Sequence, residues 1–190
     1  MPEDRLTAEE QHTLLALARE ALEGSVLGKP WFPLALSGYP PRLREEGASF
    51  VTLTIGGQLR GCIGALQAYQ PLAEDVREHA ISAGLEDPRF PPVRVDELSQ
   101  IQIEVSRLSR PVPLEYETPE ALPGRLRPHL DGVILSDGLH RATFLPQVWE
   151  KIPDPVEFLE NLCYKMGAGP DLWRRKHLDV QIYEVQEFHE

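Results

Sequence analysis

The sequence predicts a mixed α+β fold rather than a doubly wound parallel sheet. Three observations lead to this prediction: two β-hairpin patterns, single helical segments between the strands, and no strict strand-helix alternation. The chain has 190 residues, of which 42% are hydrophobic and 26% charged, values typical of globular proteins. We expect residues 1–190 to form a single domain or two tightly joined lobes, with no linker that marks a boundary.

The elements follow in order along the chain. Thr7 and Glu10 are spaced as a capping box for a first helix that we expect to end at Gly24. A proline-rich loop follows, and we expect Trp31 and Phe32 to pin it to the surface. Further segments are predicted from their periodicity and turn residues: a hairpin at 49–66, a helix at 71–84, a strand at 101–108, a hairpin at 132–145, a helix at 153–169 and a closing strand at 179–188.

Charge and cysteine content limit the classes of function. The net charge is −11 and the pI about 5.0, so most of the surface repels nucleic acid, and we expect no nucleic-acid partner. Two cysteines are too few for a disulfide scaffold. The acidic N-terminal stretch lacks the features of a signal peptide, and no apolar run is long enough for a membrane span. We therefore expect a cytoplasmic protein without a membrane partner.

The stretch "LRGCIG", residues 59–64, is the first candidate site. Arg60 and Cys62 are two residues apart on an expected strand, so they share a face, and an arginine beside a thiol favours the reactive thiolate. Gly61 and Gly64 would let a ligand or another backbone approach closely. Cys163, by contrast, lies on the apolar face of a helix, where a thiol is normally a buried hydrophobic group.

A packing role for Cys62 stays open beside the catalytic one. If Gly56 and Gly57 form the hairpin turn, Cys62 lies opposite Val51 and Arg60 lies opposite Leu53. Cys62 would then fill a small slot on an apolar face. Cys62 is therefore a candidate nucleophile and also a candidate core residue.

The stretch "EDPRFPP", residues 86–92, is the second candidate site. Asp87 before a proline favours a turn, and its carboxylate could pair with Arg89, while Phe90 would anchor the loop. Arg60, Asp87 and Arg89 together could hold an anionic or polar ligand, and a rigid corner without a ligand is the alternative.

The remaining patterns give little support for a metal or a cofactor. The chain has six histidines, but none forms a spaced ligand pair, and there is no C-x-x-C, phosphate-binding loop or dinucleotide motif. We therefore expect no metal site and no cofactor. His79 falls on the buried stripe of its helix, which favours a hydrogen-bonded core histidine, and His129 with Asp131 is a weak ligand pattern.

A series of motifs resembles one known family. "LRGCIG", "EDPRFPPV" with "DEL" after it, "IEVSRLSRP", "DGVIL", "TFLPQVWE" and "EFLENLCYKMGAG" occur in the order typical of the AMMECR domain, and the bacterial and archaeal form is called AmmeMemoRadiSam system protein A. The resemblance runs from about Phe50 to Tyr183.

The resemblance implies an α+β fold of two unequal lobes of mixed or antiparallel sheet with a cleft between them. It implies a signature surface of Arg60, Gly61, Cys62, Ile63 and Gly64, with Asp87, Arg89 and Phe90 nearby. It also implies two partners, a Memo-type protein and a radical S-adenosylmethionine (SAM) protein. The leading hypothesis is an accessory protein that binds a small ligand or a partner at this surface. The alternatives are a thiol-dependent enzyme with Cys62 as nucleophile and a pure interaction adaptor.

Overall fold

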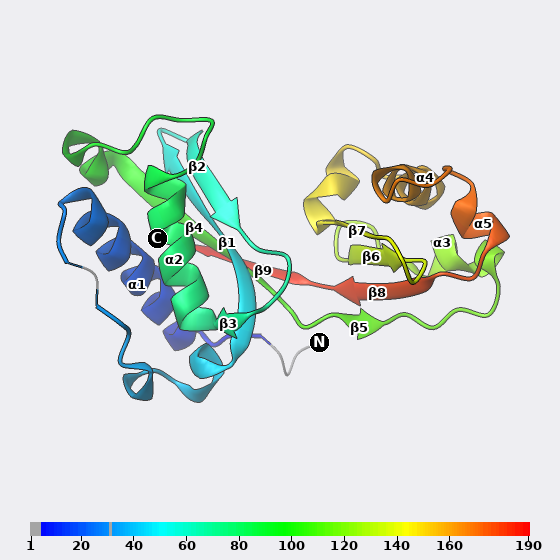
Figure 1. Ribbon diagram of the computed structural model, residues 1–190, viewed down its shortest axis with the longest axis horizontal. Coiled ribbons are helices and arrows are strands. Elements are labelled where there is room, and N and C mark those ends of the chain that lie inside the picture. Colours follow the sequence, from blue (N-terminus) through cyan, green and yellow to red (C-terminus); the bar gives the residue numbers. More distant parts are fainter. Residues whose placement is uncertain (1–4, 31) are drawn as a thin grey trace. The chain divides into compact units, whose positions relative to one another are not determined.

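The computed structural model describes residues 5–30 and 32–190 and divides the chain into two compact units. Unit 1 comprises Met1–Ser109 and Gln186–Glu190, and unit 2 comprises Arg110–Val185. Each unit has its own helices, antiparallel sheet and hydrophobic core (Figure 1). The α+β class is therefore confirmed, and the cleft stays a prediction.

Unit 1 is a sheet with helices on one face (Figure 1). The strand order is β2-β1-β4-β9, and a short β3 pairs with the start of β1. The bounds in unit 1 are α1 Ala8–Val26, η2 Leu36–Gly38, η3 Pro41–Arg44, β1 Glu46–Ile55, β2 Gln58–Gly64, β3 Gln70–Pro71, α2 Leu72–Leu85, η4 Val95–Gln100, β4 Ile101–Leu108 and, at the unit boundary, β9 Val185–His189.

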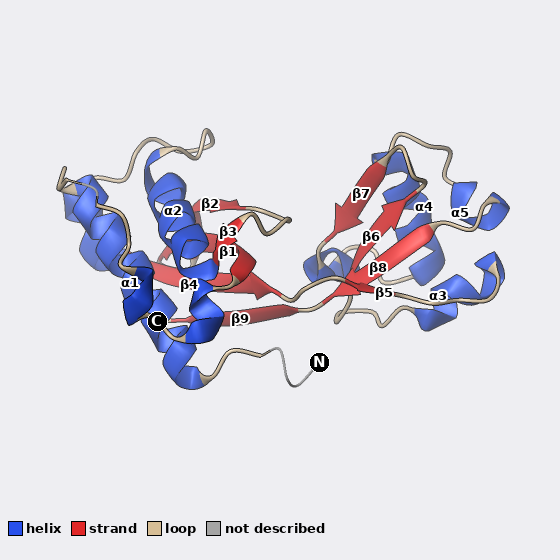
Figure 2. Ribbon diagram, turned by 60° about the horizontal axis from the view of Figure 1, so that its bottom comes forward, coloured by secondary structure: helices blue, strands red, loops and turns tan. Residues whose placement is uncertain are grey.

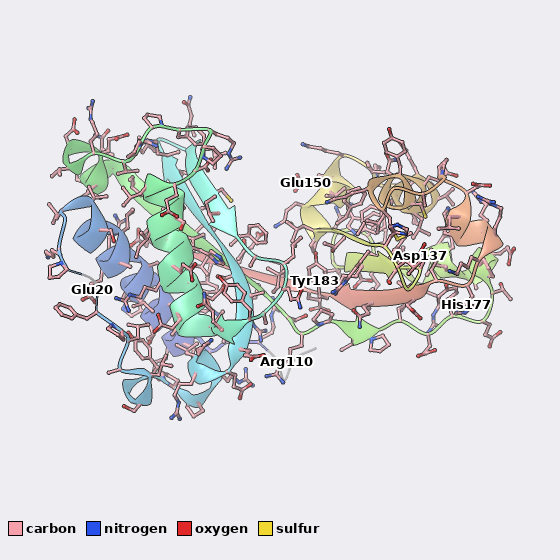
Figure 3. The ribbon with its side chains drawn as sticks, viewed as in Figure 1. Glu20, Arg110, Asp137, Glu150, His177 and Tyr183 are labelled. Atoms are coloured by element: carbon pink, nitrogen blue, oxygen red, sulfur yellow. The ribbon has the colours of Figure 1, made fainter. Side chains whose placement is uncertain are left out.

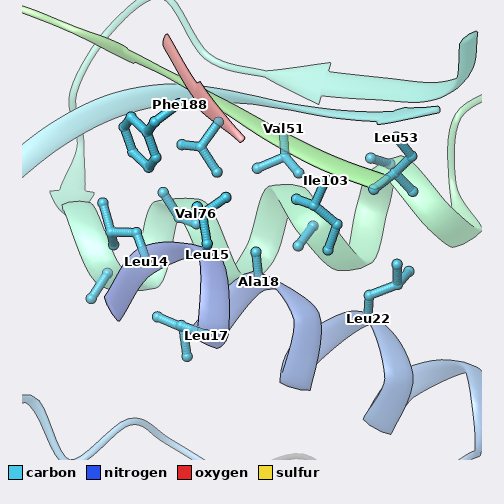
Figure 4. Packing of buried hydrophobic residues seen from close by; sticks show 14 of the residues in the cluster. Leu14, Leu15, Leu17, Ala18, Leu22, Val51, Leu53, Val76, Ile103 and Phe188 are labelled. Carbon is cyan, nitrogen blue, oxygen red and sulfur yellow. The ribbon is translucent and has the colours of Figure 1, made fainter. Parts of the chain in front are cut away.

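The core of unit 1 forms where α1 and α2 pack on the sheet (Figure 4). Alternate strand residues such as Val51, Leu53 and Ile103 face the helices and are fully buried. The capping box of Thr7 and Glu10 is present as predicted. Gly24 does not end α1, which continues for two more residues because no residue there forces a left-handed conformation.

The β1–β2 hairpin is present with the expected turn, but the predicted register of β2 is wrong. Ile55 pairs with Gln58 and Thr54 with Leu59, and the register then shifts so that Leu53 pairs with Gly61. Arg60 is therefore the extra residue of a β-bulge. A one-residue shift moves every later side chain to the opposite face of a strand, so Cys62 lies opposite Thr52 and not Val51.

Unit 2 is a four-stranded sheet of order β5-β8-β6-β7 with helices packed on one face (Figure 2). Its core centres on Trp149, which stacks on Phe158 with ring centroids 3.7 Å apart, and it includes the fully buried Cys163. The bounds in unit 2 are β5 Val112–Pro113, η5 Pro119–Ala121, α3 Leu122–Arg125, β6 Gly132–Ser136, β7 Arg141–Phe144, η6 Pro146–Glu150, α4 Pro155–Lys165, α5 Leu172–Arg175 and β8 Asp179–Tyr183.

Two further sequence predictions have outcomes here. Phe32 is 68% exposed, so it does not anchor the proline-rich loop as predicted; Trp31 lies outside the described residues. No helix within residues 5–30 or 32–190 combines the length and apolar character needed to cross a membrane.

Candidate functional site

The glycines of "LRGCIG" allow close internal packing of strand β2. A Cβ atom on Gly61 would lie 2.0 Å from the carbonyl oxygen of Ala83 in α2, far inside van der Waals contact. A Cβ atom on Gly64 would lie 2.3 Å from the ring of Phe50 on the neighbouring strand. The close approach predicted from these glycines is therefore made by the chain's own α2 backbone and by an aromatic ring.

The turn that carries Asp87 covers the free edge of β2. β2 is an edge strand, because β1 is its only strand partner within residues 5–30 and 32–190. The backbone N–H of Cys62 donates to Oδ2 of Asp87 at 2.8 Å, and the carbonyl of Cys62 accepts from Nη2 of Arg89 at 3.1 Å. Two side chains thus occupy the hydrogen-bonding positions that a further strand would use, which protects an exposed edge from unwanted pairing.

Asp87 is the centre of this arrangement. Its carboxylate is buried and also accepts from the backbone N–H of Arg89 at 3.0 Å and from the Arg89 guanidinium at 2.9 Å and 2.6 Å. These hydrogen bonds hold the pKa of Asp87 well below its usual range, the guanidinium being the main cause. The predicted ion pair between Asp87 and Arg89 is confirmed, and the turn is built around a carboxylate that is ionised at neutral pH.

The Cys62 thiol lies on the face of the sheet that α1 and α2 do not cover. It is half-buried and accepts a hydrogen bond from Oγ1 of Thr52 at 3.3 Å. The pKa of Arg89 is raised, mainly by its hydrogen bond to Asp87 and to a smaller extent by the Cys62 side chain. Among the residues that the structure describes, no histidine or carboxylate forms a hydrogen bond with this thiol. Arg89 is therefore a cation beside Cys62, and the described part of the chain places no general base on the thiol.

Arg60 has a different partner from the one expected. Its Nε donates to Oε1 of Glu97 at 2.7 Å and its Nη2 to Oε2 at 3.1 Å, which lowers the pKa of Glu97. The structure thus brings Asp87 and Arg89 together at Cys62 and commits Arg60 to another acid. Sequence reasoning gave Glu97 no role, although it is the glutamate of the quoted "DEL" motif, which was the one available signal.

The same open face carries a carboxyl group in register with Cys62. Thr52 pairs with Cys62 on one side and with Glu104 on the other, so the three residues form a row across β2, β1 and β4. Partial burial, followed by the nearby charge of Glu187, raises the pKa of Glu104. The row offers a thiol, a hydroxyl and a carboxyl group to a ligand.

The histidines form no metal site within the described part of the chain, where no group of three or more potential ligands occurs. His79 is a buried core residue, as predicted, with Nδ1 3.2 Å from Asp75, which also accepts from the Ser49 hydroxyl at 2.6 Å. His129 and Asp131 do not form the suggested ligand face, because the buried Asp131 is bound by the guanidinium of Arg127.

Comparison with known proteins gives a consistent result. The AMMECR1 family model matches residues 15–188. A protein from Methanothermobacter thermautotrophicus is 40% identical over 190 residues, covering 97% of this chain and 96% of its own length. Protein MJ0810 from Methanocaldococcus jannaschii is 35% identical, covering 97% and 92%. The crystal structure of the uncharacterized protein PH0010 from Pyrococcus horikoshii matches with a TM-score of 0.78 and 35% identity, covering 97% of this chain and 93% of that one.

Proposed function

This chain belongs to the AMMECR1 family, and from that premise we propose that it is an accessory binding protein of a Memo-type protein and a radical SAM protein. The proposed contact region consists of residues 59–64 of β2 and residues 87–90 of the following turn, here called the edge-strand surface. The Memo-type protein is the proposed direct partner, because the family resemblance associates the two.

The observation that carries this proposal is that the Arg89 guanidinium is held by Asp87 and is still exposed to solvent. Its Nε and Nη2 are held by Asp87, yet its side chain is 53% exposed, and its Nη1 has no hydrogen-bond partner among the described residues. A guanidinium that is fixed in position loses little conformational freedom on binding. In a chain of net charge −11, it offers a pre-organised cation to a carboxylate on a partner.

Hydrogen bonds from neighbouring segments also hold the edge-strand surface in place, and this pre-organisation favours binding of a partner. Asp87 joins the turn to the backbone of β2, and Glu97 holds Arg60 from the next segment. Binding to such a surface needs little loop ordering, which is one of the main costs of association. A small ligand at the same place is the second form of this proposal.

A thiol-dependent enzyme with Cys62 as nucleophile is the alternative function. One observation favours it, namely the guanidinium of Arg89 beside the thiol, because a neighbouring cation stabilises a thiolate. Nucleophilic catalysis by a thiol usually also needs a general base, and among the described residues no histidine or carboxylate forms a hydrogen bond with the Cys62 thiol. The missing base makes the binding function the better supported of the two.

The test of the binding proposal is calorimetric titration of this protein with the Memo-type and radical SAM proteins of the same organism. Arg89→Gln removes the exposed cation and is expected to weaken binding of the Memo-type protein at least tenfold. Arg94→Gln is the matched control, because Arg94 also pairs with an aspartate two residues away, Asp96, and both of these side chains are exposed. Equal affinity of wild type and Arg89→Gln would remove this residue from the contact.

The enzyme alternative has its own test, which is the rate of alkylation of Cys62 by iodoacetamide at neutral pH. If Arg89 activates the thiol, Arg89→Gln slows labelling, whereas Arg60→Gln does not, since Arg60 is bound to Glu97. Fast labelling combined with full activity of the Cys62→Ser variant in the partner system would eliminate the nucleophile role.

A further inference from the structure

Unit 2 contains a hollow of about 430 Å³ on the face of its sheet opposite the helices. Its floor is formed by Ile134 and Ser136 of β6 and by Gln181 of β8. One wall is the segment from Pro113 to Tyr116, and His177, labelled in Figure 3, lies just before the first residue of β8. The volume falls within the range of roughly 300–1,000 Å³ that is usual for small-molecule sites. This hollow lies outside the edge-strand surface.

The wall of the hollow is fixed by contacts within unit 2. The hydroxyl of Tyr116 donates to the carbonyl of Leu178 at 2.8 Å and accepts from its N–H at 2.7 Å. The rings of Tyr116 and His177 are stacked, with centroids 4.1 Å apart and planes 6° apart. The backbone N–H of Leu114 donates to the carbonyl of Val180 at 2.9 Å. The hollow is therefore pre-formed and does not need to be assembled by a ligand.

Charged groups of opposite sign flank the floor of the hollow. Arg141 of β7 and Asp179 of β8 both lie in register with Ser136 of β6, so the three form one row across neighbouring strands. Two strand spacings separate the Cα atoms of Arg141 and Asp179 by roughly 10 Å. Neither side chain has a hydrogen-bond or ion-pair partner among the described residues, and the same holds for Glu115 on the wall.

We propose that this hollow binds a small zwitterion, with its carboxylate on Arg141 and its ammonium group on Asp179. The guanidinium can hold a carboxylate in a two-point contact, and the aspartate can accept hydrogen bonds from an ammonium group. Glu115 adds a second negative charge for the ammonium group, and the buried Ile134 gives an apolar floor for a side chain. The size of the hollow fits a ligand of the dipeptide class.

The experiment is a calorimetric titration of the whole protein with glycyl-leucine, up to roughly 10 mM because isolated small ligands often bind weakly. Acetyl-glycyl-leucine lacks the ammonium group and glycyl-leucinamide lacks the carboxylate. Each blocked peptide is expected to bind at least tenfold more weakly. Arg141→Gln should abolish the difference between glycyl-leucine and its amide, and Asp179→Asn should abolish the difference between glycyl-leucine and its acetyl form.

Two control variants separate this effect from general changes of charge. Arg125→Gln and Glu150→Gln alter exposed residues of unit 2 that do not line the hollow, and both should bind glycyl-leucine as wild type does. All four altered side chains are exposed and form no hydrogen bond or ion pair with another described residue, so each variant should keep the far-ultraviolet circular dichroism of wild type. The proposal is overturned if glycyl-leucine gives no binding heat, or if the blocked peptides bind as tightly as the free one.

Discussion

Replacing Asp87 by asparagine tests the physical basis of the edge-strand surface. The substitution keeps the size of the side chain and removes its charge. The carboxylate accepts hydrogen bonds from the backbone of Cys62 and from the backbone and guanidinium of Arg89, and it is buried. An asparagine carbonyl oxygen can keep one or two of these bonds, but the remaining donors lose an ionised acceptor. We therefore expect Asp87→Asn to destabilise unit 1.

The expected loss of folding free energy in Asp87→Asn follows from the hydrogen bonds that lose their charged acceptor. A hydrogen bond to a charged group contributes about 1.5–3 kcal/mol, and one or two such bonds weaken in Asp87→Asn while Arg89 can return to water, so the net cost is about 2–3 kcal/mol. That cost corresponds to an increase of about 30- to 150-fold in the exchange rate of amides that open with unit 1.

Native-state hydrogen exchange measured by NMR is the suitable assay, because it reports on unit 1 separately. The amides of Val51 and Ile103, both fully buried, report on the unit, and the amide of Cys62 reports on the cap itself. The matched control is Asp96→Asn, which breaks an exposed pair of the same spacing and should leave the exchange of these amides unchanged.

The effect should also depend on pH in a defined direction. The pKa of Asp87 in the folded protein lies below its usual value of 3.8, so the unfolded chain binds more protons between the two pKa values. The stabilisation by this carboxylate is therefore complete above about pH 5 and declines as the pH falls below about 4. Wild type and Asp87→Asn should approach each other in stability there. Equal exchange rates at pH 7, or a difference that does not change with pH, would refute the reasoning.

Three further predictions concern residues of both units. Iodoacetamide should label the half-buried Cys62 in the native protein, while the fully buried Cys163 should react only in denaturant, as peptide mass mapping would show. Gly61→Ala should cost more than about 3 kcal/mol or prevent folding, because its Cβ would overlap a backbone oxygen of α2, whereas Gly124→Ala, with open space around it, should unfold at the wild-type denaturant midpoint. Asp75→Asn should destabilise unit 1 by about 1–3 kcal/mol, because the buried Ser49 hydroxyl and His79 imidazole lose their shared acceptor. Amide exchange measures this effect, and a loss of less than about 1 kcal/mol would contradict the prediction.

The helices and hairpins were predictable because their signals are local. Thr7 caps α1 and Asp154 caps α4, each through a side chain that accepts from nearby backbone N–H groups. Gly56 and Gly57 adopt positive φ angles in the first hairpin turn, as a two-residue turn of this type requires. Such signals depend on residues a few positions apart, so one sequence is enough to recognise them.

The site was harder to predict because it depends on one bulge and on distant partners. No local sequence pattern predicts the bulge at Arg60, yet that bulge determines which face of the sheet carries Cys62. Glu97, the partner of Arg60, lies 37 residues further along the chain, and the backbone of Cys62 meets Asp87 across 25 residues. Only the pair of Asp87 and Arg89, two residues apart, could be inferred from spacing.

The most direct test of the proposed function is hydrogen exchange of this protein measured by mass spectrometry with and without the Memo-type protein. If the edge-strand surface is the contact, peptides that cover residues 58–66 and 86–90 should exchange more slowly in the mixture, and peptides from the α1 face of unit 1 should not change. Protection confined to other segments, or no complex with the Memo-type protein at all, would contradict the proposal that this surface recognises that partner.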